Sequence, residues 1–338
     1  MQHYQMTVLL GSITLISKHI YSMLFSIVHI LHVSKCIVLS LFSTLLFACV
    51  STAPIDAEPS IIPANAQQTY QVISERRLQA DGFNKGIDTY QLIRDFAGQK
   101  SLEAPDLYDN NHPGLAHIYE ASDDIVGEHF VFTIHKNQDK DRDVSSIKDR
   151  QRNEIKGYSG SSEDLKAYKN EMFSYSWKFK LNKNITVSKN FGHFFQLKAV
   201  DGGPGAPILT LSGRNKNGQW LEVIHRIHGK TTFLKRIPLE PLKGKWLQST
   251  LFVNYSNNGQ LELLLTDIVN NEVVLHLSLD NIDMLRGEGG RDFVRPKWGI
   301  YRSLRSKEML RDAEEKVFFA DFIVQKLEVS PAITIPKN

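Results

Sequence analysis

Beyond residue 115 the chain shows a repeated alternation of apolar and polar side chains. The clearest run is FSYSWKFKL at residues 173–181, in which four aromatic residues and a leucine alternate with serine and lysine. Because successive side chains of a strand point to opposite faces, this run predicts a strand with one buried face. Similar runs occur at residues 128–135, 151–157, 191–199, 206–212, 219–228, 246–255, 260–266, 272–279, 296–302 and 317–328.

Glycine- and asparagine-rich turn signals, such as DGGPG at residues 201–205, separate these runs. About ten strands with little helix predict one all-β domain, a two-sheet sandwich or jelly roll, at residues 101–330. An N-terminal extension, residues 50–100, precedes this domain and holds one short amphipathic helix within residues 84–98. Residues 331–338 are expected to form a tail.

The N-terminal region has the pattern of an export signal. Residues 36–48 are an apolar run that follows Lys35, too short for a membrane span and suited to a signal peptide over residues 1–49. The run ends in Leu-Phe-Ala before Cys49, which is similar to a bacterial lipoprotein signal. Lipidation of Cys49, ordinary cleavage and an uncleaved anchor all stay open. Each places the remaining chain outside the cytoplasm, with residues 50–69 as a tether.

Charge and cysteine content narrow the function classes. The 338 residues hold 40 Lys plus Arg and 37 Asp plus Glu, and two of the cations, Lys18 and Lys35, lie in the first 50 residues. The near-balance of the remainder argues against a nucleic-acid binder. Both cysteines, Cys36 and Cys49, belong to the N-terminal region. The domain therefore has no disulfide, no catalytic thiolate and no cysteine-ligated zinc.

Three of the expected strands place polar side chains together on one face. Alternation groups the following residues, segment by segment: Arg150, Arg152, Glu154 and Lys156; Gln196 and Lys198; Lys297, Gly299 and Tyr301. A half-exposed strand shows the same alternation without any function, so that alternative stays open. If the three strands share a sheet, its basic face would suit an acidic polymer. Gly299 is expected to leave open space for a ligand between its two neighbours on that face.

These segments resemble the motifs of jelly-roll polysaccharide lyases. R-x-E-x-K at residues 152–156, Q-x-K at 196–198 and K-x-G-x-Y at 297–301 follow the order of R-x-E-x-R, Q-x-H and K-x-G-x-Y in family 7 alginate lyases. The longer strings that contain these motifs, DRQRNEIK, FxHxFQxK and KWGIYRS, are similar to those of heparin lyase I, glucuronan lyase and some ulvan lyases. The resemblance spans residues 105–328 and implies a concanavalin A-like sandwich. Lys198 replaces the histidine of the second motif, which leaves the catalytic histidine open.

The resemblance implies cleavage of a uronate-containing polymer by β-elimination. Gln196 and Arg152 would neutralise the substrate carboxylate. Tyr301 would be the acid, and with Lys297 or Arg152 lowering its pKa it could also act as the base.

Two histidines are candidates for the catalytic histidine. The resemblance favours His193, although strict alternation places it on the packed face of its strand unless a bulge at Gly192 turns it back. His135 ends the run at 128–135, where its side chain could reach the cleft edge. The remaining candidates are expected to be surface or loop histidines: His112, His117, His225 and His228.

The expected partner is an anionic polysaccharide, bound by a monomer that needs no cofactor and holds no catalytic metal. The residues expected to bind it are Lys198, Lys297, His135, Arg150, Lys156 and Glu154. The acidic run at residues 139–143 is expected to be a solvated charge run, with a structural calcium site as the alternative. A non-catalytic carbohydrate-binding sandwich is the rival function. A glycoside hydrolase ranks lower, since no pair of separated carboxylates is evident.

Overall fold

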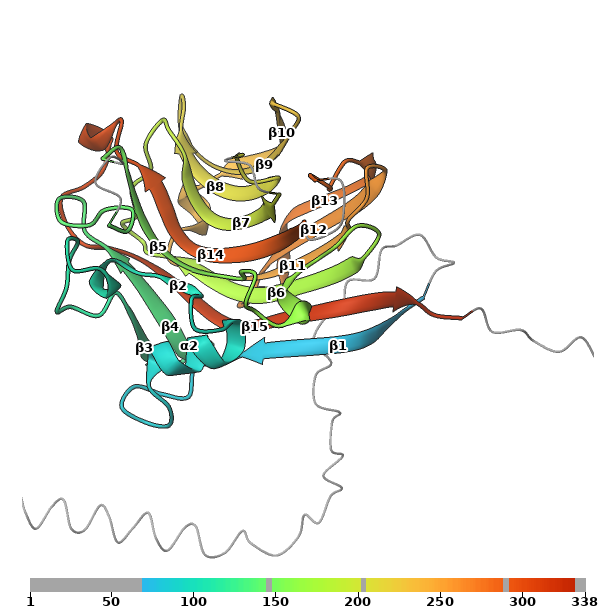
Figure 1. The fold of residues 1–338 in the computed structure, drawn as a ribbon. Coiled ribbons are helices and arrows are strands. Elements are labelled where there is room, and N and C mark those ends of the chain that lie inside the picture. Colours follow the sequence, from blue (N-terminus) through green and yellow to red (C-terminus); the bar gives the residue numbers. More distant parts are fainter. Residues whose placement is uncertain (1–68, 144–147, 202–204, 288–291, 332–338) are drawn as a thin grey trace, which may run out of the picture. The chain divides into compact units, whose positions relative to one another are not determined.

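The alternating runs form the strands of two antiparallel sheets, stacked as layers in the computed structural model (Figure 1). The structure describes residues 69–143, 148–201, 205–287 and 292–331. The predicted leader with Cys49 lies outside these residues, as do most of the predicted tether and tail. Among the described residues, no helix has the length and apolar character to cross a membrane.

The first sheet has eight strands. Its order is β13 (Glu272–Ile282), β12 (Gly259–Asp267), β11 (Trp246–Asn254), β6 (Met172–Leu181), β15 (Glu315–Val329), β4 (Gly127–Ile134) and β3 (Ile118–Asp123), with β1 (Tyr70–Leu78) also paired to β15. The second sheet has seven strands. Its order is β10 (Lys230–Pro238), β9 (Gln219–Ile227), β8 (Leu209–Asn215), β7 (Gly192–Val200), β14 (Phe293–Ser303), β5 (Arg150–Lys156) and β2 (Leu102–Glu103).

The chain passes repeatedly from one sheet to the other. It alternates between them from β4 through β5 and β6 to β7, and again from β13 through β14 to β15. Strands that follow each other in sequence are thus wrapped around a shared interior, which is the organisation of a jelly roll. The prediction of an all-β, two-sheet jelly roll is confirmed.

Aromatic side chains fill the space between the sheets. Trp177 of β6 stacks on Phe195 of β7 with ring centroids 4.4 Å apart, and it meets the edge of Trp298 from β14 at 6.2 Å. All three side chains are at most 2% exposed. Burial of these apolar faces gives each sheet one inner and one outer face, so Arg152 of β5, Gln196 of β7 and Tyr301 of β14 lie on the outer face of the second sheet.

The expected helix is confirmed as α2 (Thr89–Ala97). The Asp88 carboxylate caps it by accepting the backbone N–H groups of Tyr90 and Gln91. Its buried residues are Ile93, Phe96 and Ala97. The helix packs against β1 and β3 of the first sheet. The predicted domain boundary at residue 101 stays a prediction. Four single-turn 3₁₀ helices complete the description: η1 (Pro105–Leu107), η2 (Glu163–Leu165), η3 (Glu240–Leu242) and η4 (Lys307–Met309).

Candidate active site

A cavity of about 880 Å³ lies on the outer face of the seven-stranded sheet. Six cationic side chains line it: Arg150, Arg152, Lys198, Arg214, Arg226 and Arg305. Asp149 is the one acidic residue among its described lining residues, and its carboxylate accepts hydrogen bonds from Arg150 and Arg305. The excess of positive charge in a partly enclosed space favours a polyanionic ligand.

Predicted residues from three strands meet in this cavity. Tyr301, His193, Gln196, Arg152, Lys198 and Arg150 all line it. Lys297, Lys156, Glu154 and His135 do not line it. Sequence reasoning missed three of the lining cations, Arg214, Arg226 and Arg305. Arg214 lies on β8, Arg226 on β9 and Arg305 in the loop after β14, and none of them belongs to a recognisable motif. For the first two, the alternation of side chains along the strand was the one signal that could have placed them on the outer face.

A bulge turns His193 into the cavity. Along β7, Phe194 and Phe195 are adjacent in sequence yet both buried, at 3% and 2% exposure, and the pairing with β8 shifts register between His193 and Phe195. The extra residue reverses the face of the sheet to which the preceding side chains of β7 point. Strict alternation, which places His193 on the packed face, is therefore wrong here. The bulge lies at Phe194 rather than at Gly192.

His193 is held as a neutral imidazole. Burial and the nearby charges of Arg152 and Lys297 lower the pKa of His193 to about 3. Its Nδ1 lies 2.7 Å from the hydroxyl of Ser212, and its ring stacks on Phe191 with centroids 5.1 Å apart. These contacts fix the ring plane and leave Nε2 without a hydrogen-bond partner among the described residues.

Tyr301 pairs with His193 across β14 and β7, and their ring centroids are 5.9 Å apart. Arg150 donates a hydrogen bond of 3.1 Å to the phenolic oxygen. Burial raises the pKa of Tyr301, although the charge of Arg152 and the hydrogen bond from Arg150 act in the opposite direction. The phenol is therefore protonated near neutral pH, beside an imidazole that carries a free lone pair. This pair can donate and accept a proton on the same ligand.

Glu154 lies beneath the cavity and connects the three motifs. It is 1% exposed, and one carboxylate oxygen accepts hydrogen bonds of 2.6 Å from both Arg152 and Lys297. Its other oxygen accepts a hydrogen bond from the Gln196 amide. An amide nitrogen carries two hydrogens, so Gln196 keeps a second N–H for a ligand.

Two further carboxylates complete this buried network. Asp141 binds Arg152 through both carboxylate oxygens, at 2.8 and 3.2 Å. Glu103 of β2 accepts hydrogen bonds from Lys297 at 2.8 Å and Lys156 at 2.7 Å. Burial alone would raise the pKa of Glu103, but the charges of Lys297 and Arg152 lower it well below the usual value. Lys297, only 1% exposed, therefore neutralises carboxylates inside the protein.

The acidic run at residues 139–143 is not a solvated charge run. Asp139 is 3% exposed and Asp141 is 1% exposed, because each faces buried cations or histidines.

Gly299 also differs from the expectation that it leaves open space for a ligand. A side chain there would lie 2.1 Å from the carbonyl oxygen of Asn153, at a φ of +142°. The glycine accommodates the backbone of β5 and leaves no space for a ligand.

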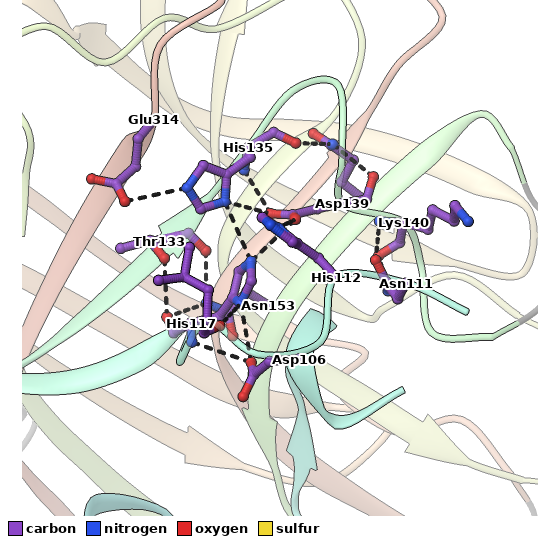
Figure 2. A network of polar contacts seen from close by, with 12 residues as sticks. Asp106, Asn111, His112, His117, Thr133, His135, Asp139, Lys140, Asn153 and Glu314 are labelled. Atoms are coloured by element: carbon purple, nitrogen blue, oxygen red, sulfur yellow. Dashed lines mark hydrogen bonds and ion pairs between the residues drawn. The ribbon is translucent and has the colours of Figure 1, made fainter. Parts of the chain in front are cut away.

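Of the two predicted binding residues Lys198 and His135, the first lines the cavity and the second does not. The ammonium of Lys198 donates to the carbonyl of Gly205 at 2.5 Å, and burial together with neighbouring cations such as Lys297 lowers its pKa to about 8. His135 belongs to a separate group with His112 and His117 (Figure 2). His117 is fully buried, so it is not the surface histidine that was expected.

No protein-family model matches this sequence, and no curated protein matches it. Several solved structures are similar. An endo-β-1,4-glucuronan lyase from the fungus Trichoderma reesei has 12% identity and a TM-score of 0.46, over 75% of this chain and 95% of that one. The PL-14 alginate lyase from Aplysia kurodai has 10% identity and a TM-score of 0.47, over 77% and 100%. An alginate lyase from Klebsiella pneumoniae has 11% identity and a TM-score of 0.44, over 68% and 94%.

Proposed function

We propose that this protein is a polysaccharide lyase that cleaves an anionic, uronate-containing polymer by β-elimination. The observation that carries the proposal is the pairing of Tyr301 and His193 on neighbouring strands of a basic cavity. One group is a protonated acid and the other an unprotonated base at neutral pH. Six cations surround them, which is the charge expected for a polyanion substrate.

In the proposed reaction the C5–H bond of a uronate breaks, a C4–C5 double bond forms, and the C4–O4 bond breaks. His193 accepts the C5 proton at Nε2, and Tyr301 donates its phenolic proton to the leaving O4. Proton transfers of this kind each contribute roughly 10²–10⁴ in rate. The low pKa of free His193 is offset when the substrate carboxylate binds, because its negative charge opposes the effect of Arg152.

The substrate carboxylate must be neutralised for C5 to release its proton. The second amide N–H of Gln196 and the guanidinium of Arg152 are available to donate to this carboxylate, and both residues line the cavity. Glu154 acts through them as a positioning residue, because it holds both donors from below. Preorganised donors of this type stabilise charge that develops in the transition state.

We further propose that the chain is exported, on the strength of the apolar run at residues 36–48 and the polymer substrate.

The carboxylates of the cavity support a glycoside hydrolase less well than a lyase. Of the described lining residues only Asp149 is acidic, and it is paired with Arg150 and Arg305. A hydrolase of the usual kind needs two carboxylates beside the scissile bond.

A substrate panel tests the proposal. Purified protein is incubated with glucuronan, alginate, ulvan, a heparin-type polymer and a neutral glucan, and the ultraviolet absorbance of the unsaturated product is followed. We expect absorbance to rise with at least one uronate polymer and not with the neutral glucan. Binding without any absorbance change on all uronate polymers would favour the carbohydrate-binding module. New reducing ends without absorbance would favour a hydrolase.

A further inference from the structure

Three histidines and one aspartate converge beside β3 and β4 of the first sheet (Figure 2), and none of the four lines the cavity. His117 directly precedes β3 and His135 directly follows β4, while His112 and Asp139 come from the adjoining loops. One potential ligand atom from each residue lies within 4.8 Å of all the others. His117 and Asp139 are buried, and the other two are half-buried.

The spacing of these atoms matches a tetrahedral metal site. Nδ1 of His135 lies 3.3 Å from Nε2 of His117, and the Asp139 carboxylate lies 2.8 Å from Nδ1 of His112 and 3.1 Å from Nε2 of His117. Zinc bonds to nitrogen and oxygen are about 2.0–2.1 Å long, which puts the ligand atoms of a tetrahedron about 3.3 Å apart. These three separations lie within about 0.5 Å of that value, and the wider pairs, which lie within 4.8 Å, would close around the ion.

The contacts of His117 set its tautomer. Nδ1 lies 2.6 Å from the backbone carbonyl of Leu115 and 3.1 Å from the carboxylate of Asp106. A carbonyl oxygen only accepts, so Nδ1 carries the hydrogen and a neutral ring presents its lone pair at Nε2, toward the cluster. A histidine held by a carboxylate on its far nitrogen is the usual outer arrangement of a zinc ligand. Glu314 contacts Nε2 of His135 in the same manner, at 3.3 Å.

We propose that His112, His117, His135 and Asp139 bind one divalent transition-metal ion, with zinc as the best fit. Three imidazoles and one carboxylate are borderline ligands that suit zinc and are unsuited to calcium, which prefers oxygen. Four protein ligands close the coordination sphere, as in structural zinc sites. The ion would take no part in the proposed lyase chemistry itself, because none of its ligands lines the cavity.

The ion would fasten a loop that supports the cavity. Gln151 of β5 donates hydrogen bonds to the carbonyls of His135 and Asp139, at 2.7 and 2.8 Å. Two residues after Asp139, Asp141 binds Arg152. Metal at Asp139 would therefore hold the loop that orients Arg152 beneath Tyr301. We assign the ion a positioning role rather than a catalytic one.

The test measures metal directly on untagged protein. We expect one equivalent of zinc per chain by mass spectrometry, and a fall in the melting temperature of roughly 5 °C or more on chelation that added Zn²⁺ reverses. The variant His112→Ala/His135→Ala should lose the bound zinc and the response to chelator. His276→Ala, which removes a histidine paired with Glu262 outside the cluster, is the control.

Cobalt provides a measurement that does not depend on the variants. Chelated wild-type protein titrated with Co²⁺ should develop the visible absorption of a tetrahedral complex at one equivalent, and Zn²⁺ should abolish it. If the double variant fails to fold, this titration decides alone. Absence of stoichiometric zinc and cobalt binding, with a melting temperature insensitive to chelator, would show a hydrogen-bonded His–Asp cluster and overturn the proposal.

Discussion

The guanidinium carbon of Arg152 lies 3.7 Å from the ring centroid of Tyr301. Asp141 and Glu154 hold the guanidinium in place, so the cation is fixed against the face of the ring rather than free in the cavity. A cation in this position interacts favourably with the ring and still more with a phenolate. Arg152 therefore stabilises the charge that Tyr301 would acquire after giving up its proton.

Tyr301→Phe should lower kcat by about 10²-fold or more, because the proton donor is lost. Affinity for the polymer should change little, since the phenyl ring keeps its contact with Arg152. Rates come from product absorbance and affinity from calorimetry with the inactive variant. Tyr168→Phe removes a hydroxyl that donates to Glu163 outside the cavity and serves as the control. If kcat of the Tyr301→Phe variant stayed within about tenfold of wild type, Tyr301 would not be the acid.

His193→Ala should abolish turnover, with a loss of roughly 10²–10⁴-fold, at nearly unchanged thermal stability. The side chain lines the cavity and leaves no core void. The adjacent Phe194→Ala is the matched contrast, because it empties a core position and should cost about 3–5 kcal/mol in the free energy of unfolding. Ser212→Ala, which frees Nδ1 of His193, should lower kcat with little effect on affinity. An active His193→Ala enzyme would point to Tyr301 as both acid and base.

The strands were predictable where one face is buried and the other is not. β6 shows this plainly, because its aromatic side chains enter the core while its lysines face outward. β10 was missed, since its burial pattern is exposed or half-exposed along the whole strand and the sequence shows no alternation. β1 was missed as well, because Leu78 is its one buried residue. Each of these two strands pairs with a single neighbouring strand and buries few of its side chains, so little apolar period is left to detect.

The alternation of side chains along β5, β7 and β14 predicted which polar residues share a face, but not how deeply each of them is buried. Whether a lysine lies in a cavity or under it depends on carboxylates from other segments. Glu103, which binds Lys297, comes from β2, almost two hundred residues earlier in the chain. The bulge at Phe194 was equally hidden, because an inserted residue changes parity without a sequence signature.

Lys297→Met should destabilise the protein by about 3–5 kcal/mol, because Glu103 and Glu154 would stay buried with less neutralising charge. The free energy of unfolding is measured by urea denaturation. Lys100→Met, at an exposed position, should stay within about 0.5 kcal/mol of wild type. Wild-type stability in the Lys297 variant, combined with weaker polymer binding, would instead indicate direct contact with substrate.

Polymer affinity should fall as pH rises through about 8, the pKa to which burial and neighbouring cations lower Lys198. Lys198 is charged below that pH and neutral above it, so its attraction to a substrate carboxylate is lost on the alkaline side. We expect KM to rise roughly threefold or more between pH 7 and 9. Lys198→Arg keeps its charge throughout and should flatten this rise. An equal rise in that variant would assign the titration to another group.

Salt should weaken substrate binding, because the cavity concentrates cations in a chain whose formal net charge is only +3. At physiological ionic strength the Debye length is about 8 Å, so each exposed contact with the polymer is partly screened. The double variant Lys198→Ala/Arg226→Ala removes two lining charges and should flatten the dependence of KM on salt. Lys100→Ala/Lys169→Ala removes the same charge from exposed positions outside the lining residues and should leave that dependence unchanged. If both double variants behaved alike, the net charge of the protein rather than the cavity would govern binding. Binding insensitive to salt in the wild type would contradict an anionic substrate, since neutral glycans are held by contacts that salt does not screen.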